Sequence, residues 1–291
     1  MNSISRKSLG HYLVIPVLLL LIVVILVPEI WSFALSLTRY EPGGNIEYRG
    51  LLNYINIFLD SSFWNAVKNN IIFVIVVVSL QLLLALGFAL LLARGFKGQK
   101  IWVSCVILPY ALSPVVTVSI WKYMLNYDIG IINFILDKIG FAPIPWLSNS
   151  LWAFIAVIIV YTWKQVPFTF IIVYPARLSI SRELYEAAAI DGANEWQHFR
   201  FITFPILKPT ILVAMTFRLI LAFRAFGEIW LLTGGGPIKS TEVLAIYMYK
   251  EGFKYWHWGI SAAVGVLILL LTMMMSYPQM RIMYRQMFQN E

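Results

Sequence analysis

The chain has 291 residues, of which 60% are hydrophobic and only 12% are charged, and its mean hydropathy is +0.78. Ordinary soluble domains are about 45–50% apolar, so this composition excludes a soluble globular protein and indicates an integral membrane protein. The single cysteine, Cys105, excludes an intrachain disulfide and a thiolate metal cluster. The three histidines (His11, His198 and His257) show no metal-ligand spacing, so we expect no metal site.

Six windows of the sequence are long and apolar enough to cross a membrane, which takes about 20 predominantly apolar residues. In chain order they cover residues 11–37, 70–93, 101–125, 151–176, 210–232 and 259–278. The connections between them are too short for a separate soluble domain, which usually needs about 50 residues or more. We therefore expect an all-α polytopic membrane protein with six transmembrane helices. Residues 1–69 would form an N-terminal helix and first outer loop, and residues 70–291 a five-helix core.

Charge distribution predicts the orientation of these helices. Arg6 and Lys7 precede the first window, but that window is too long for a signal peptide and lacks a small-residue cleavage site. Lys and Arg in short loops collect on the cytoplasmic side. With the N-terminus inside, more of the 22 Lys and Arg residues fall in cytoplasmic than in outer loops. Both termini and the loop 177–208 are therefore expected in the cytoplasm.

Residues 231–241 read LLTGGGPIKST, a glycine-rich stretch with a lysine and two hydroxyl side chains. A phosphate-binding loop reads G-x-x-x-x-G-K-[ST] and follows a buried strand. Here Ile238, not glycine, precedes Lys239, and the stretch follows an expected membrane helix. The sequence thus argues against an NTPase site. Because glycine adopts positive φ and proline stops a helix, we expect a tight outer turn. We call its residues Gly234, Gly235, Gly236 and Pro237 the outer turn.

The loop 177–208 has the end signals of two short helices. Ser181 is a suitable N-cap for the first helix, and Gly192 suits the left-handed position that ends it. Asn194 and Gln197 match a capping box for the second helix. Pro205 and Pro209 then lead the chain to the fifth window.

The first of these short helices favours protein docking over resting on the bilayer. Leu184, Ala187 and Ala188 share one face, and their small side chains allow close approach. Helices that lie on a bilayer usually carry Lys and Arg on their polar face. This one carries acidic residues instead, among them Glu186 and Asp191.

The same loop carries a recognisable motif, E-A-A-x-x-x-G followed by I-x-x-P. Its residues here are Glu186, Ala187, Ala188, Gly192, Ile202 and Pro205. The loop resembles the EAA loop of permease subunits in binding-protein-dependent ABC importers. The similarity extends through WKYMLNYDIGIIN (121–133), WKQVPF (163–168) and AFRAFGEIWLLTGGGP, which ends at Pro237. Together these segments resemble the carbohydrate-uptake branch of the family, which includes the maltose F-type and glycerol-phosphate A-type subunits.

This resemblance implies the type I ABC importer permease fold and a set of partners. They are a second permease of the maltose G type, two ATPase subunits and an extracytoplasmic solute-binding protein that delivers a sugar. The chain itself would be a multi-pass protein of the bacterial or archaeal cytoplasmic membrane. It would not be an enzyme and would hold no cofactor, since the ATPase subunits bind ATP and Mg²⁺. Glu186, Asp191 and Gly192 would then belong to the surface that couples to the ATPases, and the outer turn would meet the binding protein or gate the solute path.

The resemblance also implies a solute path. It maps onto Trp163, Lys164, Gln165, Phe168, Arg224, Gly227 and Glu228. Aromatic rings stack on sugars while amide and charged groups bond their hydroxyls. We expect Pro167 to break the fourth helix and free backbone groups there. The cations leave open an anionic solute, whereas Arg224 and Glu228, four residues apart, leave open a simple ion pair along one helix face.

Two other classes of function compete with this one. An ion-coupled secondary transporter would need inverted repeats, interrupted helices in both halves and buried carboxylates. Only Glu228 and Glu29 come near the last of these requirements. An intramembrane enzyme would need a nucleophile, a base or a metal cluster, and no such spacing stands out.

Overall fold

The computed structural model describes the backbone of residues 6–40 and 43–288, and the side chains of residues 14–40 and 43–282. Most of the described chain is helical, and it also contains one short two-stranded antiparallel ribbon. The chain divides into two compact units. Unit 1 comprises residues 1–61 and 248–269, and unit 2 comprises residues 62–247 and 270–291.

Unit 1 begins with a long apolar helix. Its parts are α1 (Arg6–Leu21), the π-helical η1 (Ile22–Leu26) and α2 (Val27–Ser36), which together confirm the first expected span. The ribbon of β1 (Thr38–Arg39) and β2 (Glu47–Tyr48) follows, then α3 (Leu52–Leu59). Asn53 joins these segments, because its Nδ2 donates to the carbonyl oxygens of Ser36 and Thr38, both at 2.8 Å.

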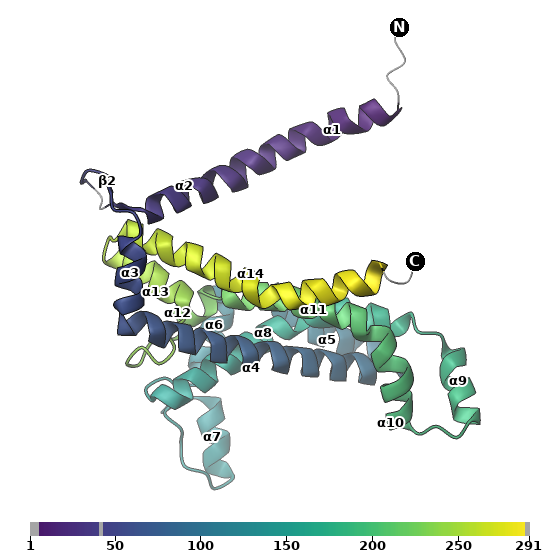
Figure 1. Ribbon diagram of the computed structural model, residues 1–291. Coiled ribbons are helices and arrows are strands. Elements are labelled where there is room, and N and C mark those ends of the chain that lie inside the picture. The colour runs from purple at the N-terminus through teal and green to yellow at the C-terminus, as the bar shows by residue number, and fades with distance from the viewer. Residues whose placement is uncertain (1–5, 41–42, 289–291) are drawn as a thin grey trace. The chain divides into compact units, whose positions relative to one another are not determined.

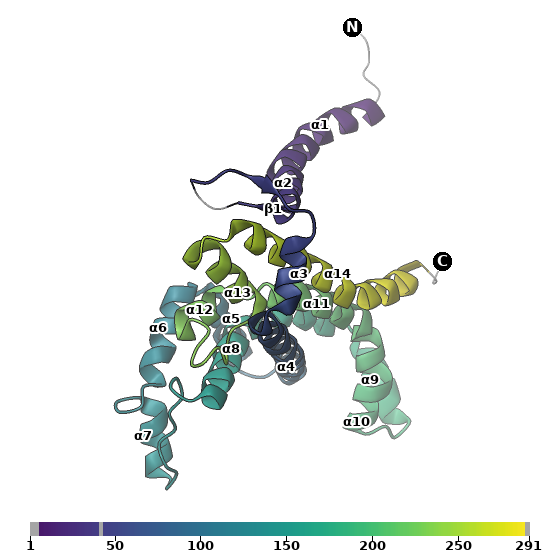
Figure 2. The same ribbon diagram turned by 60° about the vertical axis from the view of Figure 1, so that its left-hand side comes forward.

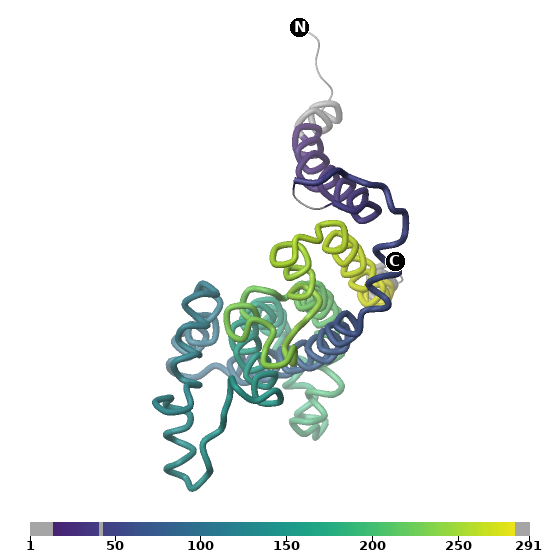
Figure 3. The backbone as a smooth tube through the Cα atoms, turned by 90° about the vertical axis from the view of Figure 1, so that its left-hand side faces the viewer, coloured from purple at the N-terminus to yellow at the C-terminus, as the bar shows by residue number. Residues whose placement is uncertain are grey.

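Unit 2 holds most of the membrane helices (Figure 1). In chain order its elements are α4 (Ser61–Leu92), α5 (Gln99–Ala111), α6 (Pro114–Met124), α7 (Ile131–Lys138), α8 (Ser150–Leu178), α9 (Arg182–Ile190), α10 (Glu195–Gln197), π-helical η2 (His198–Thr203), α11 (Phe204–Phe223) and α12 (Gly227–Thr233). Two further elements are divided between the units: α13 (Leu244–Tyr249) begins in unit 2 and ends in unit 1, and α14 (Trp258–Phe288) begins in unit 1 and ends in unit 2. The π-helical η3 (Lys250–Lys254) belongs to unit 1. In all three views α7 projects from the rest of the unit (Figures 1, 2 and 3).

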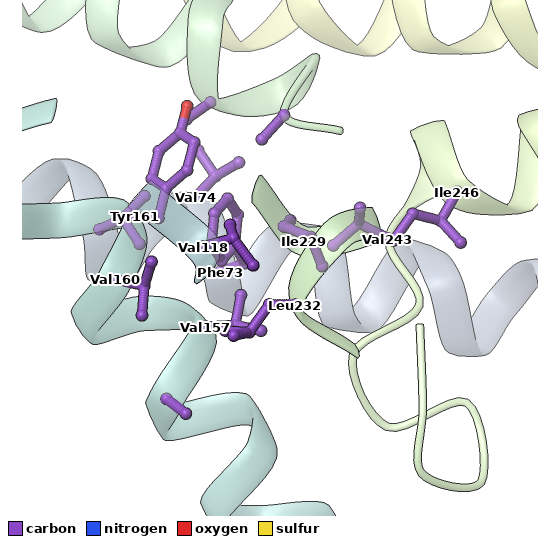
Figure 4. Packing of buried hydrophobic residues seen from close by; sticks show 14 of the residues in the cluster. Phe73, Val74, Val118, Val157, Val160, Tyr161, Ile229, Leu232, Val243 and Ile246 are labelled. Carbon is purple, nitrogen blue, oxygen red and sulfur yellow. The ribbon is translucent and has the colours of Figure 1, made fainter. Parts of the chain in front are cut away.

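The core of unit 2 lies where α4, α6, α8 and α12 meet. Phe73, Val157 and Ile229 come together there with side chains of the 243–246 segment (Figure 4). Between membrane helices the association depends on close packing, because lipid tails are as apolar as the core side chains. Small residues allow that approach, and several alanines have no exposed surface: Ala66, Ala85, Ala89, Ala153, Ala156, Ala214 and Ala222.

Within the described residues, five helices are long and apolar enough to span a membrane, or six if the bent pair α5 and α6 forms one span. The sequence predicted one continuous window over 101–125, but α5 and α6 are bent by 103°. Pro114 explains the bend, since proline drives the preceding residue into extended conformation, and Ser113 has ψ of 153°. Ser113 also caps α6 by accepting from the backbone N–H of Val116 at 3.3 Å.

Two other expectations about helix boundaries are wrong. The fifth window, predicted over 210–232, begins as a helix at Glu195, passes through η2 and ends at Phe223. Pro167 does not break the fourth helix, because α8 continues through it to Leu178. A single missing N–H costs one hydrogen bond of the ladder, which a long, well-packed membrane helix tolerates.

Candidate functional site

The local signals of the loop 177–208 are confirmed in detail. The Oγ of Ser181 accepts from the backbone N–H of Glu183 at 3.3 Å and caps α9. Gly192 follows the C-cap residue of α9 with φ of +79°. Asn194 and Gln197 form the capping box, with bonds of 2.9 and 2.7 Å between each side chain and the other's backbone N–H.

The helix α9 is exposed along its whole length. None of its residues, all of which the structure describes, is buried. Glu186 and Ala187 are exposed and Ala188 is half-buried, while Ile190 exposes 87% of its surface. In Figure 1, α9 and α10 lie at one end of unit 2 and α7 and α12 at the other. A short exposed helix with a small-residue face is suited to bind a partner.

Tyr185 ties α9 to the membrane helices. Its hydroxyl lies 2.8 Å from Oγ1 of Thr203 in η2, and the guanidinium carbon of Arg177, near the end of α8, lies 4.7 Å from its ring centre. The Tyr185 ring also packs edge to face with the ring of His198, with 5.8 Å between the ring centres. These ties were not predicted, because they join residues 8 to 18 positions apart across two loops.

The motif residues after α10 lie on the helix that enters the membrane. Ile202, in η2, is half-buried against the cluster that contains Phe170 and Leu207. Pro205 is exposed in the first turn of α11, where a missing N–H is harmless. Arg94, just past α4, forms an exposed ion pair with Glu195 of α10 at 3.0 Å.

A buried polar cluster links four helices of unit 2. Arg218 of α11 has no exposed surface, and its Nε donates to Oε1 of Gln81 in α4 at 2.7 Å. Its Nη1 donates to Oε1 of Gln165 in α8 at 3.2 Å. Gln165 in turn donates from Nε2 to Oε1 of Glu228 in α12 at 3.4 Å. The chain of bonds thus connects a cation and a carboxylate through an amide.

Aromatic faces complete the surroundings of Arg218. Its guanidinium carbon lies 5.6 Å from the ring centre of Phe168 and 5.8 Å from that of Tyr161. Phe168 also packs against Phe217 and Tyr110. Arg218 Nη2 has no hydrogen-bond partner among the described residues, and neither has Nε2 of Gln81. Arg218 lies inside the fifth window of the sequence, where a charged side chain usually faces a cavity or a partner, but it was not among the residues of the implied solute path.

Lys164 serves the bend between α5 and α6. It is 5% exposed, and its Nζ donates to the carbonyl oxygen of Leu112 at 2.5 Å. This carbonyl lies at the break, where no helical N–H follows to bond it. The side chain of Trp163 does not join this contact. It is 37% exposed and packs edge to face with Trp121, with 5.7 Å between the ring centres.

The predicted solute residues are only partly together. Gln165, Phe168 and Glu228 belong to the Arg218 cluster, whereas Arg224 is exposed. The possible ion pair along one helix face is not formed, because α11 ends at Phe223 and α12 begins at Gly227. Residues 224 and 228 therefore lack the helical spacing that the sequence implied.

The outer turn begins a longer segment, residues 234–242, that is held by several hydrogen bonds. We call this segment the 234–242 turn. Gly234 and Gly235 have φ of +62° and +89°, as expected of glycines in a turn. Thr241 is buried, and its hydroxyl lies 2.7 Å from that of Thr233 and donates to the carbonyl oxygen of Gly236 at 2.9 Å. Among the described residues no three His, Cys, Asp or Glu side chains converge as a metal site would require.

The site thus consists of apolar membrane helices around a buried polar cluster, with an exposed helix at one end of unit 2. Comparison with known proteins identifies the family. Residues 81–289 match the family described as "Binding-protein-dependent transport system inner membrane component". The chain belongs to this family of ABC transporter permeases, which are inner-membrane proteins.

The chain is similar over nearly its full length to several named proteins. It is 33% identical to the trehalose/maltose transport system permease protein MalF of Thermococcus litoralis, covering 94% of each chain. It is also 33% identical to the sulfoquinovosyl glycerol transport system permease protein SmoG of Agrobacterium fabrum, covering 96% of this chain and 92% of that one. In fold it matches a chain of the bacterial alginate ABC transporter in complex with an alginate pentasaccharide-bound periplasmic protein, with a TM-score of 0.82 at 24% identity over 95% and 94% of the two chains. The predicted type I ABC importer permease fold is confirmed.

Proposed function

We propose that this chain is the translocation subunit of an ATP-driven importer for a sugar or sugar derivative. Its partners would be a second permease, two ATPase subunits and an extracytoplasmic solute-binding protein. The observation that carries the proposal is α9, an exposed helix bonded through Tyr185 to the ends of two membrane helices. Relatives named for trehalose, maltose and sulfoquinovosyl glycerol support a sugar as the solute.

In this proposal α9 receives the movement of the ATPase subunits. Its exposed residues Glu186, Ala187 and Asp191 would fit a groove of an ATPase, and Gly192 allows the sharp turn that follows. Closure of the ATPase pair on ATP would move α9, and the ties at Tyr185 would carry that movement into α8 and α11. The chain contributes no hydrolytic step, since ATP and Mg²⁺ would be held by the ATPase subunits.

The solute would pass beside the Arg218 cluster. Gln165 and Glu228 offer groups that bond sugar hydroxyls, and Phe168 offers a ring face for its C–H surfaces. The buried cation Arg218 also fits an anionic sugar derivative. Gly227 lies at the start of α12 beside Pro114 and leaves room there.

The orientation follows from the same proposal. If α9 meets the ATPases, its end of unit 2 faces the cytoplasm, and the 234–242 turn lies on the outer side. Both termini would then be cytoplasmic, as the distribution of Lys and Arg predicts.

The test is reconstitution in proteoliposomes with the second permease, the ATPase subunits and the binding protein from the same organism. We expect uptake of radiolabelled maltose, trehalose or a sulfonated sugar only when ATP, both ATPase subunits and the loaded binding protein are present. Uptake by the chain alone, abolished by a proton or sodium ionophore, would instead establish an ion-coupled secondary transporter.

A further inference from the structure

The 234–242 turn carries a strained residue at an exposed position. Ile238 has φ of +50° and Lys239 has φ of +59°. Left-handed backbone is uncommon for any residue with a side chain, and for a β-branched residue it is an outlier. Glycine or asparagine would relieve the strain, so local conformation does not account for an isoleucine here.

Packing does not account for Ile238 either. Its side chain is 93% exposed and buries almost no apolar surface within unit 2. Single exposed hydrophobic residues are ordinary on protein surfaces. An exposed hydrophobic residue in strained backbone is unusual, because both its conformation and its exposure are unfavourable in the isolated chain.

Hydrogen bonds from α4 hold this conformation in place. The carbonyl oxygen of Lys239 accepts from Nδ2 of Asn65 and from Nδ2 of Asn69, both at 3.0 Å. The Nζ of Lys239 donates to Oγ of Ser62 at 2.6 Å. Nδ2 of Asn69 also donates to the carbonyl oxygen of Glu242 at 3.1 Å. Strained backbone persists only where its surroundings over-determine it, and such residues cluster at ligand clamps and switch segments.

The contacts with α4 also show where the turn lies along that helix. They involve residues 62–69 in the polar first turns of α4, whereas the apolar run begins at Ile71, roughly 13 Å beyond Ser62 at 1.5 Å per residue. The other end of α4 leads to Arg94, which pairs with Glu195 of α10. The turn therefore lies at the end of unit 2 opposite α9, outside the apolar part of α4.

We propose that Ile238 is a rigid docking contact for the solute-binding protein. The inference rests on the proposed function, which supplies this partner, and on the description of the family as binding-protein-dependent. A soluble partner approaches the ends of the helices, whereas a second permease packs along their sides and lipid tails lie beside their apolar runs. A preorganised apolar side chain gives affinity because little freedom is lost when it enters a pocket.

Docking affinity of the binding protein tests the proposal. The complete complex would be placed in lipid nanodiscs, and the Kd of the binding protein from the same organism would be measured by bio-layer interferometry. Ile238→Asp should raise Kd by at least about tenfold, as loss of an interface anchor does. Ile238→Gly should also raise Kd, yet raise the melting temperature of the complex, because glycine relieves the strain at φ of +50°. That opposite movement of affinity and stability is not expected of a purely structural residue.

Matched variants separate docking from misfolding. Ile238→Val keeps a β-branched apolar side chain and should leave Kd within a factor of about three, since one methylene is removed. Phe96→Asp places the same charge at an exposed apolar position on the opposite end of unit 2, 45% exposed and two residues after Arg94, and should leave Kd unchanged. Unchanged Kd in both Ile238→Asp and Ile238→Gly would overturn the proposal.

Two further outcomes would assign the turn to another neighbour. If Ile238→Asp releases the second permease on size-exclusion chromatography while intact complexes dock normally, the residue is a subunit contact. Ile238→Cys, with Cys105→Ser to remove the native thiol, can carry an environment-sensitive dye. We expect the binding protein to shield this dye. A dye quenched by lipid-phase quenchers and unaffected by the binding protein would place Ile238 in lipid. If the wild-type complex does not bind the binding protein at all, the proposed function itself fails. The Ile238 variants alone test only the docking contact, not the proposed function.

Discussion

The guanidinium of Arg218 donates a hydrogen bond from Nε to Oε1 of Gln81, 137 residues away in the sequence, at 2.7 Å. Neither side chain has any exposed surface. A cation in the membrane interior is costly unless it is compensated. Here the nearest carboxylate in the chain of bonds, Glu228, is reached through Gln165, so the two charges are compensated across an amide.

Arg218→Met should strongly destabilise the protein. It leaves the side-chain oxygens of Gln81 and Gln165 without their donor and Glu228 without its cation, and breaking a buried charged network costs about 3–5 kcal/mol. The measurement is the melting temperature of the purified complex by intrinsic fluorescence. Arg218→Lys keeps the charge but lacks the planar fork that reaches two amides, so it should fall between wild type and Arg218→Met.

The double variant Arg218→Met, Glu228→Gln should recover part of that loss. Removing both charges leaves no uncompensated carboxylate, so the two effects should couple by at least about 1 kcal/mol, as interacting residues do. Strictly additive effects would show that the bonds through Gln165 do not link the two charges. Arg224→Gln serves as a control, because Arg224 is exposed and lies outside the cluster.

Gly192→Asp should uncouple transport from ATP hydrolysis while leaving binding-protein docking intact. A Cβ at residue 192 would meet nothing within 4 Å, so the substitution is limited by backbone conformation and by charge, not by space. Gly192→Asn is the matched control, since asparagine and aspartate tolerate φ of +79° to a similar degree. The ratio of solute taken up to ATP hydrolysed should fall further for aspartate, which adds negative charge at the proposed ATPase surface. Wild-type ratios in the aspartate variant would contradict the prediction. If both variants lose stability alike, Gly192 acts only as a helix terminator.

Tyr185→Phe should weaken coupling without unfolding α9. It deletes the hydroxyl bonded to Thr203 but keeps the ring that faces Arg177. A hydrogen bond of this kind contributes about 0.5–1.5 kcal/mol, which corresponds to roughly a 2–10-fold change in an equilibrium. Thr203→Val removes the same bond from the other side, together with the bond from its own hydroxyl to the carbonyl oxygen of His198 at 3.3 Å. It should therefore reduce the transport-to-hydrolysis ratio at least as much as Tyr185→Phe, and the combination should reduce it no further than Thr203→Val alone. Additive losses would show that the two hydroxyls act separately.

Which parts of the structure could be predicted depends on how local their causes are. Ser181, Gly192 and the Asn194–Gln197 box were predicted because a cap involves only neighbouring residues. The bend at Pro114 had a local cause as well, but averaging hydropathy over 101–125 concealed it. The bonds of Arg218 could not be predicted, since they require the arrangement of four helices.

Lys164→Met provides a test of a residue that the sequence assigned to the solute path. Its Nζ bonds the carbonyl oxygen of Leu112 at the bend between α5 and α6. Removing the donor leaves a half-buried carbonyl unsatisfied, which costs at most about 1–3 kcal/mol. We therefore expect a lower melting temperature for Lys164→Met, with KM for the solute little changed, and near-wild-type stability for Lys164→Arg, which keeps a donor. A raised KM at unchanged melting temperature would mean that Lys164 leaves Leu112 to bind the solute. Because the bend positions Pro114 beside Gly227, loss of this bond should also lower the maximum rate of transport.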